Sequence, residues 1–377
     1  MTFYIEKINL TQFRSYSSGR ILCDARPVVL TGPNGAGKTN MLEAISLLIP
    51  GRGLRRAKMT ELKNKDASPL EYWAIAADLV TPHGLTRIGT GLHPSQDSRV
   101  IRIDGIDQKS QSRLAEISAV VWLTPQMDGL FLDSPSARRR FLDRMIAGYD
   151  PKHLSRTARY DKLLRERAAI LKKNRNPDPN WLKITEGQLA ETGIAISAAR
   201  QLYCERLSRA IGRLKIDESD FPLPRLEVQG TIDNHLKSHP AVESEAFFAD
   251  LLHDSREIDS YTGGAREGTH KSDFRVYHHG LDMPAENCST GEQKGLLVKL
   301  ILGQASLIKA ERGFAPLLLL DDIAAHLDER RRSILFETIM QLDCQTWMTG
   351  TDRADFSYLS GKAQFYKIDH SNIQVDP

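Results

Sequence analysis

The stretch VVLTGPNGAGKTNMLEAISLL, Val28–Leu48, decides the fold. It begins with an apolar, β-branched run, breaks at a glycine, and continues with apolar residues at helical spacing. Between the two halves lies GPNGAGKT, Gly32–Thr39, which fits the phosphate-loop pattern G-x-x-x-x-G-K-[ST]. The stretch therefore predicts a strand, a phosphate-binding loop and a helix, which together open an α/β domain.

The residue types of this loop predict its chemistry. Glycines let backbone N–H groups wrap a phosphate chain, and the following helix points its positive end at the anion. We expect Lys38 at the β- and γ-phosphates and the Thr39 hydroxyl on Mg²⁺. The expected nucleotide-binding residues are Gly32, Pro33, Asn34, Gly35, Ala36, Gly37, Lys38, Thr39 and Asn40.

A second motif lies near the C-terminus, in PLLLLDDIAAHLD, Pro316–Asp328. A short, wholly apolar run is typical of a buried parallel strand, and ligands bind at the carboxyl ends of such strands. We expect Asp321 to anchor Mg²⁺ and Asp322 to act as the base or water-positioning residue in hydrolysis. The alternative is an ordinary acidic turn after a strand.

A third motif, NCSTGEQKGLLVKLI, allows two interpretations. Ser289 and Glu292 have the spacing of a capping box at the start of a helix. Alternatively, Ser289, Gly291 and Glu292 at this helix terminus receive a γ-phosphate. A chain that already holds phosphate with Gly32–Thr39 has no local use for a second such site, so this interpretation requires the nucleotide of another subunit.

The composition bounds the protein class. The chain has 377 residues, 41% hydrophobic and 26% charged, which is typical of a soluble globular protein of two or three domains. We see no run approaching the roughly 18 apolar residues of a membrane span and no signal-peptide layout. The four scattered cysteines indicate neither a zinc site nor a disulfide framework and fit a reducing cytoplasm.

Three parts follow from the sequence pattern: residues 1–133, 134–267 and 268–377. The first and third alternate strand and helix signals. The second begins at Ser134 and Pro135, a helix start, and contains two helical stretches, one to about Lys173 and one over about Trp181–Leu214. We expect these to form a short antiparallel hairpin followed by loop-rich sequence to about Gly268. The expected apolar stripes are Leu164, Ala168 and Leu171 on the first stretch, and Ile196, Ala199, Tyr203, Leu207, Ala210 and Leu214 on the second.

Basic residues are concentrated at the start of the middle part. The net charge of the whole chain is only +3, yet residues 136–175 carry thirteen Lys and Arg against four acids. A smaller basic cluster, including Arg55 and Arg56, follows the first helix. Such runs are either solvated helix faces or contacts to nucleic-acid phosphates. The candidate DNA-binding residues are Arg55, Arg56, Arg138, Arg139 and Arg140.

Taken together, these motifs resemble those of the ABC-type ATPase heads of SMC-like proteins, and more narrowly those of the RecF family of bacterial repair proteins. The resemblance also rests on four further segments that span nearly the whole chain in the same order. These are NLTQFRSY (Asn9–Tyr16), GRGLRRAKMTEL (Gly51–Leu62), SPSARRRFLD (Ser134–Asp143) and GTHKSDFRV (Gly268–Val276).

The resemblance implies an α/β, ABC-type P-loop ATPase head formed by the N- and C-terminal segments, with an inserted, mostly helical lobe that contains the hairpin. It implies that Gly32–Thr39 is the Walker A loop, Ser289–Lys294 the signature, and Asp321 with Asp322 the Walker B pair. Ala325–Asp328 then corresponds to the D-loop. Gln126 takes the Q-loop position, where it would also serve Mg²⁺, and Thr349–Thr351 the switch segment, with Thr351 as its catalytic residue.

Three positions depart from related patterns. His326 stands where the family usually has an acid, Thr351 stands where transporters carry a histidine, and Asp322 replaces the glutamate usual in transporters. A shorter carboxylate holds water less well in line, so we expect slow hydrolysis that acts as a timer.

By resemblance, we expect a weak, DNA-stimulated ATPase that takes ATP and Mg²⁺ and forms an ATP-dependent homodimer. It would clamp DNA at single-strand gaps or junctions, and load RecA together with RecR and RecO. The implied location is the bacterial cytoplasm, in association with the nucleoid and without a membrane partner.

Rival functions fit less well. A transporter subunit does not have about 250 residues between Lys38 and Ser289. A full SMC tether needs a longer hairpin, and an ATPase-coupled nuclease of the overcoming-lysogenization type needs a further metal-binding domain. A structural role without catalysis leaves the three-part nucleotide site unexplained.

Overall fold

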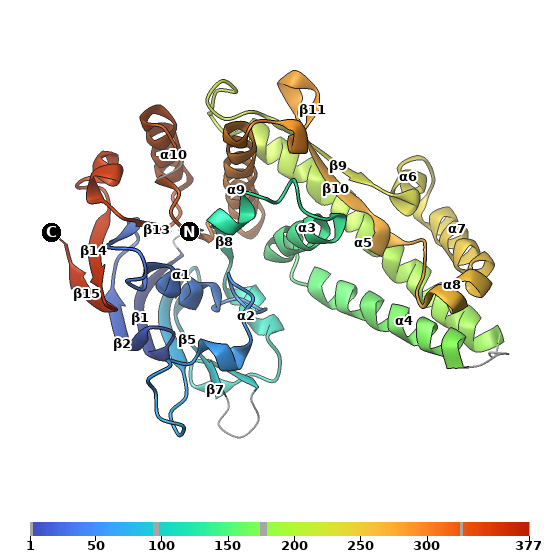
Figure 1. Cartoon of the computed structure of the whole chain (residues 1–377), viewed down its shortest axis with the longest axis horizontal. Helices are drawn as coiled ribbons and strands as arrows, with labels where there is room; N and C mark the ends of the chain where they lie inside the picture. Colours follow the sequence, from blue (N-terminus) through green and yellow to red (C-terminus); the bar gives the residue numbers. More distant parts are fainter. Residues whose placement is uncertain (1–2, 93–97, 174–178, 325–326, 377) are drawn as a thin grey trace. The chain divides into compact units, whose positions relative to one another are not determined.

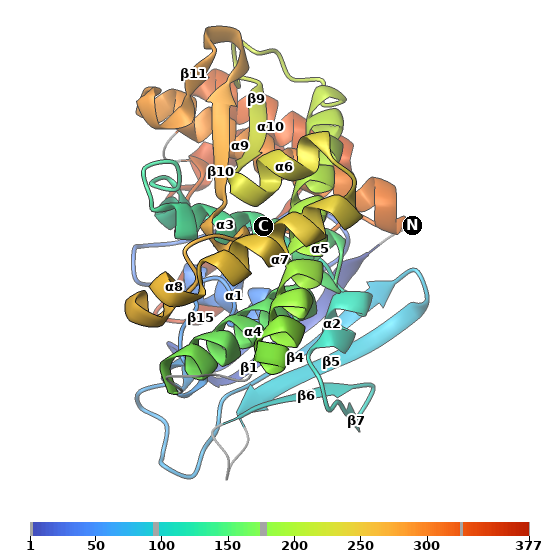
Figure 2. The same ribbon diagram turned by 90° about the vertical axis from the view of Figure 1, so that its right-hand side faces the viewer.

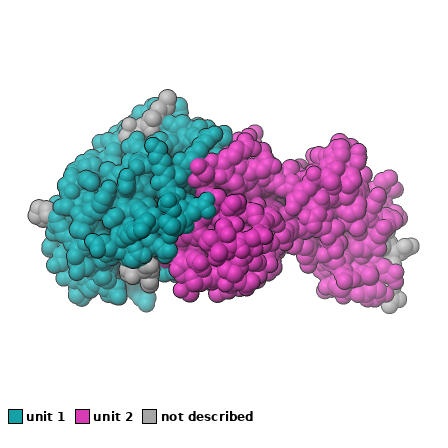
Figure 3. All heavy atoms as spheres, turned by 90° about the horizontal axis from the view of Figure 1, so that it is seen from above, with its two compact units in different colours: residues 1–128, 213–221, 297–377 teal, residues 129–212, 222–296 magenta. Residues whose placement is uncertain are grey.

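The computed structural model describes residues 3–92, 98–173, 179–324 and 327–376. The chain divides into two compact units, coloured separately in Figure 3. Residues 1–128, 213–221 and 297–377 form the first, which we call the head. Residues 129–212 and 222–296 form the second, which we call the lobe.

A mostly parallel sheet forms the centre of the head, in the order β15-β14-β3-β13-β12-β8. All its neighbouring pairs are parallel except β14 with β15. Every residue of β3 and β12 is buried, as expected for strands covered on both faces. The strands are β3 (Val28–Thr31), β8 (Val120–Leu123), β12 (Leu317–Leu320), β13 (Thr346–Gly350), β14 (Gln364–Asp369) and β15 (Asn372–Val375).

The head also contains an antiparallel sheet, part of which is labelled in Figure 1. Its strand order is β2-β1-β4-β5-β6-β7. Buried and half-buried residues alternate along β5 from Ile88 to Leu92, as expected for a sheet with one solvated face. The strands are β1 (Tyr4–Phe13), β2 (Tyr16–Leu22), β4 (Ala74–Thr81), β5 (Gly84–Leu92), β6 (Arg99–Ile103) and β7 (Ile106–Asp107).

Helices complete the head, and one of them crosses the division between the units. The division falls within α9, which begins in the lobe and continues in the head. The helices are α1 (Lys38–Ser46), α2 (Ser112–Ile117), α9 (Thr290–Arg312) and α10 (Glu329–Leu342), with 3₁₀ turns at Met59–Leu62, Pro125–Met127 and Arg353–Leu359.

The lobe is built on the long helix α5, which packs against α4, α7 and β9 (Figure 2). Its three-stranded antiparallel sheet has the order β11-β10-β9. The helices are α3 (Pro135–Tyr149), α4 (His153–Lys173), α5 (Pro179–Gly212), α6 (Thr231–Ser238), α7 (Ala241–Asp254) and α8 (Arg256–Thr262). The strands are β9 (Pro224–Gln229), β10 (Asp273–His278) and β11 (Met283–Pro284), with 3₁₀ turns at Thr269–Lys271, His279–Leu281 and Ala285–Asn287.

The structure corrects two expectations about the helices. The stretch from Pro135 to Lys173 is two helices, because Pro151 lacks an N–H and disfavours the helical conformation at Asp150. The region expected to be loop-rich up to Gly268 contains β9 and α6–α8. These helices are short, so their apolar repeats are easily missed in the sequence.

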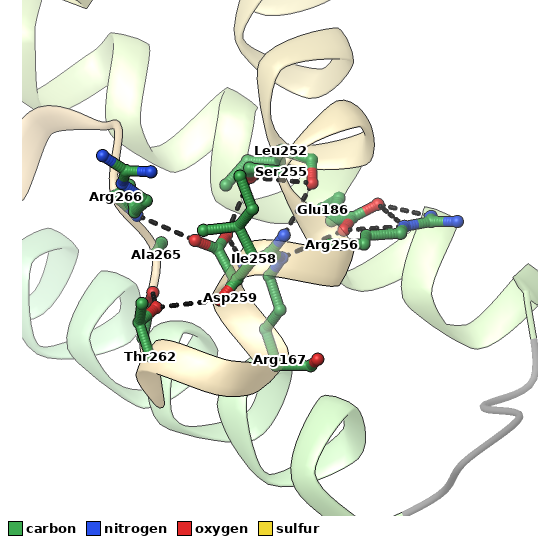
Figure 4. A network of polar contacts seen from close by, with 12 residues as sticks. Arg167, Glu186, Leu252, Ser255, Arg256, Ile258, Asp259, Thr262, Ala265 and Arg266 are labelled. Atoms are coloured by element: carbon green, nitrogen blue, oxygen red, sulfur yellow. Dashed lines mark hydrogen bonds and ion pairs between the residues drawn. The ribbon is translucent and has the colours of Figure 1, made fainter.

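The buried face of α4 also differs from the expected stripe. Of the expected residues, Leu171 is buried, whereas Leu164 and Ala168 are half-buried. The other buried residues of the helix are Tyr160, Leu163, Arg167 and Ile170, together with His153 at its start. The side chain of Arg167 is 1% exposed and pairs with Glu186 of α5 and Asp259 of α8 (Figure 4). A buried charge inside the stripe concealed the true helix face from an apolar pattern.

The boundaries of the units differ from the expected ones at 134 and 268. Residues 222–296 stay with the lobe because β10 pairs with both β9 and β11. Residues 213–221, expected within the inserted part, belong to the head. Residues 174–178, between the two predicted helical stretches, lie outside the described residues.

Candidate nucleotide-binding site

The strand order of the parallel sheet brings four predicted segments to one edge. β3, β13, β12 and β8 are parallel neighbours, so their carboxyl ends share an edge of the sheet. Each is followed by a predicted site segment: the Walker A loop, the switch segment, the Walker B pair and the Q-loop position. This is the edge at which open α/β sheets bind ligands.

Two glycines of the Walker A loop are required by their surroundings. Gly32 has φ +144°, and a Cβ there would lie 2.1 Å from the main-chain oxygen of Ile368. Gly37 has φ +114°, and a Cβ would lie 3.0 Å from both the Ser15 and Tyr16 side-chain oxygens. At Gly35 a Cβ would meet nothing within 4 Å, so that side of the loop is open. The loop is therefore closely packed at Gly32 and Gly37 and open at Gly35.

Lys38 is held by its own loop. Its Nζ donates to the main-chain oxygens of Gly32 at 2.6 Å and Pro33 at 2.9 Å. Burial lowers the pKa of Lys38, whereas the charges of Asp322 and Asp321 act to raise it. Its two acceptors are neutral carbonyls, and a charged phosphate oxygen is a stronger partner for an ammonium group than either.

Thr39, Asp321 and Thr349 form one hydrogen-bonded cluster. The hydroxyls of Thr39 and Thr349 both donate to Asp321 Oδ1, at 2.9 and 2.8 Å. These residues come from the ends of three different segments: α1, β12 and β13. A hydroxyl and a carboxylate at this separation provide the hard oxygen ligands that Mg²⁺ prefers. The structure thus brings together Thr39 and Asp321, two of the three residues assigned to the metal; the third, Gln126, is exposed.

Asp322 follows in a rare backbone conformation. Its φ is +51°, and its N–H donates to Thr349 Oγ1 at 2.8 Å. Non-glycine residues with positive φ are uncommon and are often found at functional sites. Thr349 therefore contacts both Walker B residues: its hydroxyl donates to the Asp321 carboxylate, and its oxygen accepts from the main chain of Asp322. The sequence assigned Thr349 only as part of a segment, and its role could not be read from the motif.

The helix after the loop is supported by residues that the site prediction did not include. The Tyr16 hydroxyl donates to the main-chain oxygen of Gly37 at 3.0 Å, and Asn40 donates to Ser15 Oγ at 2.8 Å. The carboxylate of Glu43 is fully buried and pairs with Arg14 and Arg55. The signal was present in the segment Asn9–Tyr16, which carries part of the family resemblance but had no assigned role.

Of the two basic candidates after the first helix, Arg55 contacts α1. Arg55 donates to Asn40 Oδ1 at 2.8 Å as well as to Glu43, and its side chain is 33% exposed. Arg56 is exposed and has φ +55°. Arg55 thus helps to fix the first turn of α1, which was not expected of a DNA-binding candidate.

The other site residues predicted in the head lie at the Q-loop position, at the end of the switch segment and in the D-loop. Gln126 is exposed in the 3₁₀ turn after β8, and Thr351 is exposed after β13. In the D-loop, Ala325 and His326 lie outside the described residues. Leu327 is buried, and Asp328 caps α10 by accepting from the N–H of Arg331 at 2.9 Å.

The signature segment forms the predicted capping box. The N–H and hydroxyl of Ser289 donate to Glu292 Oε2, both at 2.8 Å, and the N–H of Glu292 donates to Ser289 Oγ at 3.3 Å. Ser289 and Gly291 are exposed. The capping interpretation is confirmed, and it leaves an exposed serine at the start of a 23-residue helix.

The three arginines at the start of α3 have different surroundings. Arg138 is buried and forms a two-bond ion pair with Asp273, at 2.8 and 2.7 Å. Arg139 is half-buried and donates to the main-chain oxygen of Ser272; burial and the nearby charge of Arg200 lower its pKa. Arg140 is exposed. Arg138 is therefore a structural residue of the lobe and is not available for DNA phosphates.

The exposed cations of the basic run lie mainly on α4. Arg167 is buried, and Lys173 and Arg175 have side chains outside the described part of the chain. The exposed ones along α4 are Arg159, Lys162, Arg165 and Lys172. The exposed basic surface is therefore smaller than the count of thirteen Lys and Arg in residues 136–175 indicated.

Comparison with known proteins identifies the family. The family described as RecF/RecN/SMC N terminal domain matches residues 4–372. The chain is 44% identical over 372 residues to the DNA replication and repair protein RecF of Rhizobium rhizogenes, covering 98% of both chains. It is also 44% identical to RecF of Mesorhizobium japonicum, covering 98% of this chain and 97% of that one. The chain belongs to the RecF family.

Solved structures agree with this assignment. A structure of the recombination mediator protein RecF-ATPrS in the RecFOR pathway superposes with a TM-score of 0.86 at 25% identity, covering 100% of this chain and 99% of that one. The Smc head domain of Pyrococcus furiosus shares the fold with a TM-score of 0.55 at 17% identity, covering 99% of this chain and 96% of that one. The predicted fold, an ABC-type ATPase head with an inserted, mostly helical lobe, is confirmed.

The family assignment makes this chain a DNA replication and repair protein of the ATPase-head class. Among the residues that the structure describes, no helix has the length and apolar character needed to cross a membrane.

Proposed function

We propose that this RecF-family chain is an ATP-gated DNA clamp. ATP joins two copies head to tail, and the dimer holds DNA at single-strand gaps or junctions. Slow hydrolysis, which DNA stimulates, releases the DNA. The observation that carries this proposal is the cluster of Thr39, Asp321 and Thr349, which begins at the last residue of the phosphate loop. The loop itself is open at Gly35. A RecF structure described as ATP-bound, which shares the fold, supports ATP as the nucleotide.

The residues present fit ATP and Mg²⁺. Gly32–Thr39 would hold the phosphates, Lys38 would neutralise their charge, and Thr39 with Asp321 would hold Mg²⁺, with Gln126 as a further candidate. The metal supplies charge neutralisation when bound. Asp322 would accept the proton of the attacking water or orient it, and its tie to Thr349 limits its movement.

The second phosphate site supports the dimer. Ser289 is exposed at the N-terminus of α9, where oriented N–H groups and the helix dipole favour an anion. Its hydroxyl now serves Glu292 and would turn to a γ-phosphate oxygen when the partner copy supplies one. The Walker A loop and the signature belong to different compact units of the chain, which fits two composite sites per dimer.

DNA binding is assigned to the exposed cations of α4 and Arg140, with Arg55 and Arg56 as secondary candidates. Phosphate contacts by Lys and Arg supply affinity independent of base sequence, which fits a protein that recognises a DNA structure. Cooperation with RecR and RecO in loading RecA, and a location at the nucleoid, extend the proposal from the family to this chain.

A titration of DNA binding against salt, with and without ATP, tests the proposal when oligomeric state is measured in the same samples. The parent protein should dimerise with ATP and bind DNA more tightly in that state. Lys38→Ala should abolish both responses because the phosphates lose their facing charge, while its unfolding curve stays that of the parent. Lys65→Ala, an exposed lysine of the head, is the control and should behave as the parent. ATP-dependent dimers of Lys38→Ala would refute the assignment of the loop.

A further inference from the structure

The segment Arg213–Phe221, RLKIDESDF, joins two elements of the lobe but belongs to the head. It follows α5 directly and leads into β9, both parts of the lobe. We call it the crossover segment. The chain therefore leaves the longest lobe helix, contributes nine residues to the head, and returns.

A buried lysine holds the crossover segment in place. Lys299 of α9 is 2% exposed, and its Nζ donates to the main-chain oxygens of Phe221 at 2.6 Å and Ile216 at 3.4 Å. The side chains of Ile216 and Phe221 are themselves buried. Burial lowers the pKa of Lys299, whereas the acids Glu218, Asp217 and Asp220 act to raise it. A buried ammonium group needs these acceptors, so the path of the segment is fixed.

An ion pair then joins the crossover segment to the start of α10. Asp220 Oδ1 lies 2.7 Å from Arg330 Nε, and Arg330 Nη2 donates to Asp220 Oδ2 at 3.2 Å. The side chain of Asp220 is 8% exposed and that of Arg330 is 72% exposed. Arg330 lies two residues after Asp328, the cap of α10 and the last residue of the D-loop assignment. The pair thus anchors the first turn of α10, which directly follows Asp328.

The sequence of α10 supports a specific role for this pair. Three consecutive arginines, Arg330–Arg332, lie at the N-terminal end of the helix, where the helix dipole disfavours cations. Arg330 and Arg332 instead pair with carboxylates of other segments, Arg332 with Asp355 at 2.8 Å. Asp355 lies in the turn that follows the switch segment. The start of α10 is therefore held on one side by the crossover segment and on the other by the turn after the switch.

We propose that Asp220 and Arg330 are positioning residues that couple the lobe to the ATPase site. DNA bound to α4 acts on α5, against which α4 packs. The crossover segment follows α5, and the ion pair passes the change to the start of α10. This inference rests on the proposed function, because it requires that DNA changes the rate of ATP turnover.

The test compares ATP turnover with and without DNA. Asp220→Asn and Arg330→Gln should bring the ratio of the two rates close to one, while ATP binding by the monomer and the midpoint of thermal unfolding stay near those of the parent. Arg330→Lys keeps the charge and should restore much of the ratio. The double variant should be no worse than either single variant, because both remove the same ion pair.

A matched control is available in the same unit. Arg87 and Asp78 form an ion pair of nearly the same geometry, with contacts of 2.6 and 3.3 Å, between β5 and β4. Its side-chain exposures, 65% and 12%, also match those of Arg330 and Asp220. Arg87→Gln and Asp78→Asn should keep the response to DNA.

The outcomes separate the two claims. A parent protein whose ATP turnover ignores DNA would overturn the proposed function and this inference with it. A responsive parent with equally responsive Asp220→Asn and Arg330→Gln variants would overturn the coupling role alone. Loss of the response in the control pair as well would show that any ion pair of the head has this effect, which also contradicts the assignment.

Discussion

Lys38 of the head and Arg167 of the lobe are both buried cations, but they have different partners. Lys38 donates to two neutral carbonyls of its own loop. Arg167 donates to the carboxylates of Glu186 and Asp259 and to the main-chain oxygen of Leu252, which lie on three other helices (Figure 4). An anion can displace carbonyl acceptors, whereas it gains little from a guanidinium that two carboxylates already neutralise. The head thus keeps its charge ready for a ligand, and the lobe uses its charge to join helices.

The lobe network gives the largest expected effect. Arg167→Ala leaves Glu186 and Asp259 buried with one partner fewer, so the free energy of unfolding should fall by about 3–5 kcal/mol. Urea unfolding followed by circular dichroism measures it. Arg165→Ala, an exposed arginine on the same helix, should change stability by no more than about 0.5 kcal/mol. An equal loss of stability in the two variants would contradict the structural role assigned to the buried Arg167.

The signature gives the next effect, on assembly. Ser289→Arg should still bind ATP as a monomer, because the Walker A loop is intact, but should not dimerise. Mixed with Lys38→Ala, it should form dimers with at most one working composite site. Sedimentation and nucleotide binding on the same samples check this, and a loss of monomer ATP binding equal to that of Lys38→Ala would refute the site shared between copies.

The exposed face of α4 should give the smallest effect. Lys162→Glu with Arg165→Glu should weaken DNA binding about equally across sequences. The slope of log affinity against log salt should become shallower by up to ~0.9 for each duplex phosphate that the variant no longer neutralises. Lys183→Glu with Arg209→Glu makes the same charge change at exposed positions of α5 and serves as control. If neither affinity nor slope changes on α4, its cations are only a solvated surface.

The nucleotide site could be predicted because its chemistry is local. A loop that wraps phosphate needs glycines, a lysine and a hydroxyl within eight residues. A buried strand that ends in carboxylates is likewise recognisable from a short apolar run followed by two acids. The bridging role of Thr349 could not be predicted, since it depends on which strand lies beside β12. The same holds for Ser15 and Tyr16 under Gly37, which reach the loop from another sheet.

In the lobe the sequence was less informative because a charged residue does not show which way it faces. Arg138 and Arg167 counted toward a basic surface, yet both are buried in ion pairs. The sequence pattern placed the crossover segment in the inserted region, whereas the structure places it in the head, where it contacts Lys299 and Arg330. Pro151 indicates the break between α3 and α4, but the prediction of one continuous helical stretch did not take it into account.

The central claim, that ATP holds the clamp closed and hydrolysis opens it, is tested most directly by the lifetime of the DNA complex of Asp322→Asn. The substitution keeps the size of the side chain but removes the charge that would orient and deprotonate water. Asp321 and Thr39 remain to hold Mg²⁺, so ATP should still bind and dimers should still form. In a dilution experiment in ATP at fixed salt, the variant should stay dimeric and leave DNA more slowly than the parent. Release at the parental rate or faster would contradict the account, because Asp322 would not be the hydrolytic residue or hydrolysis would not be the release step.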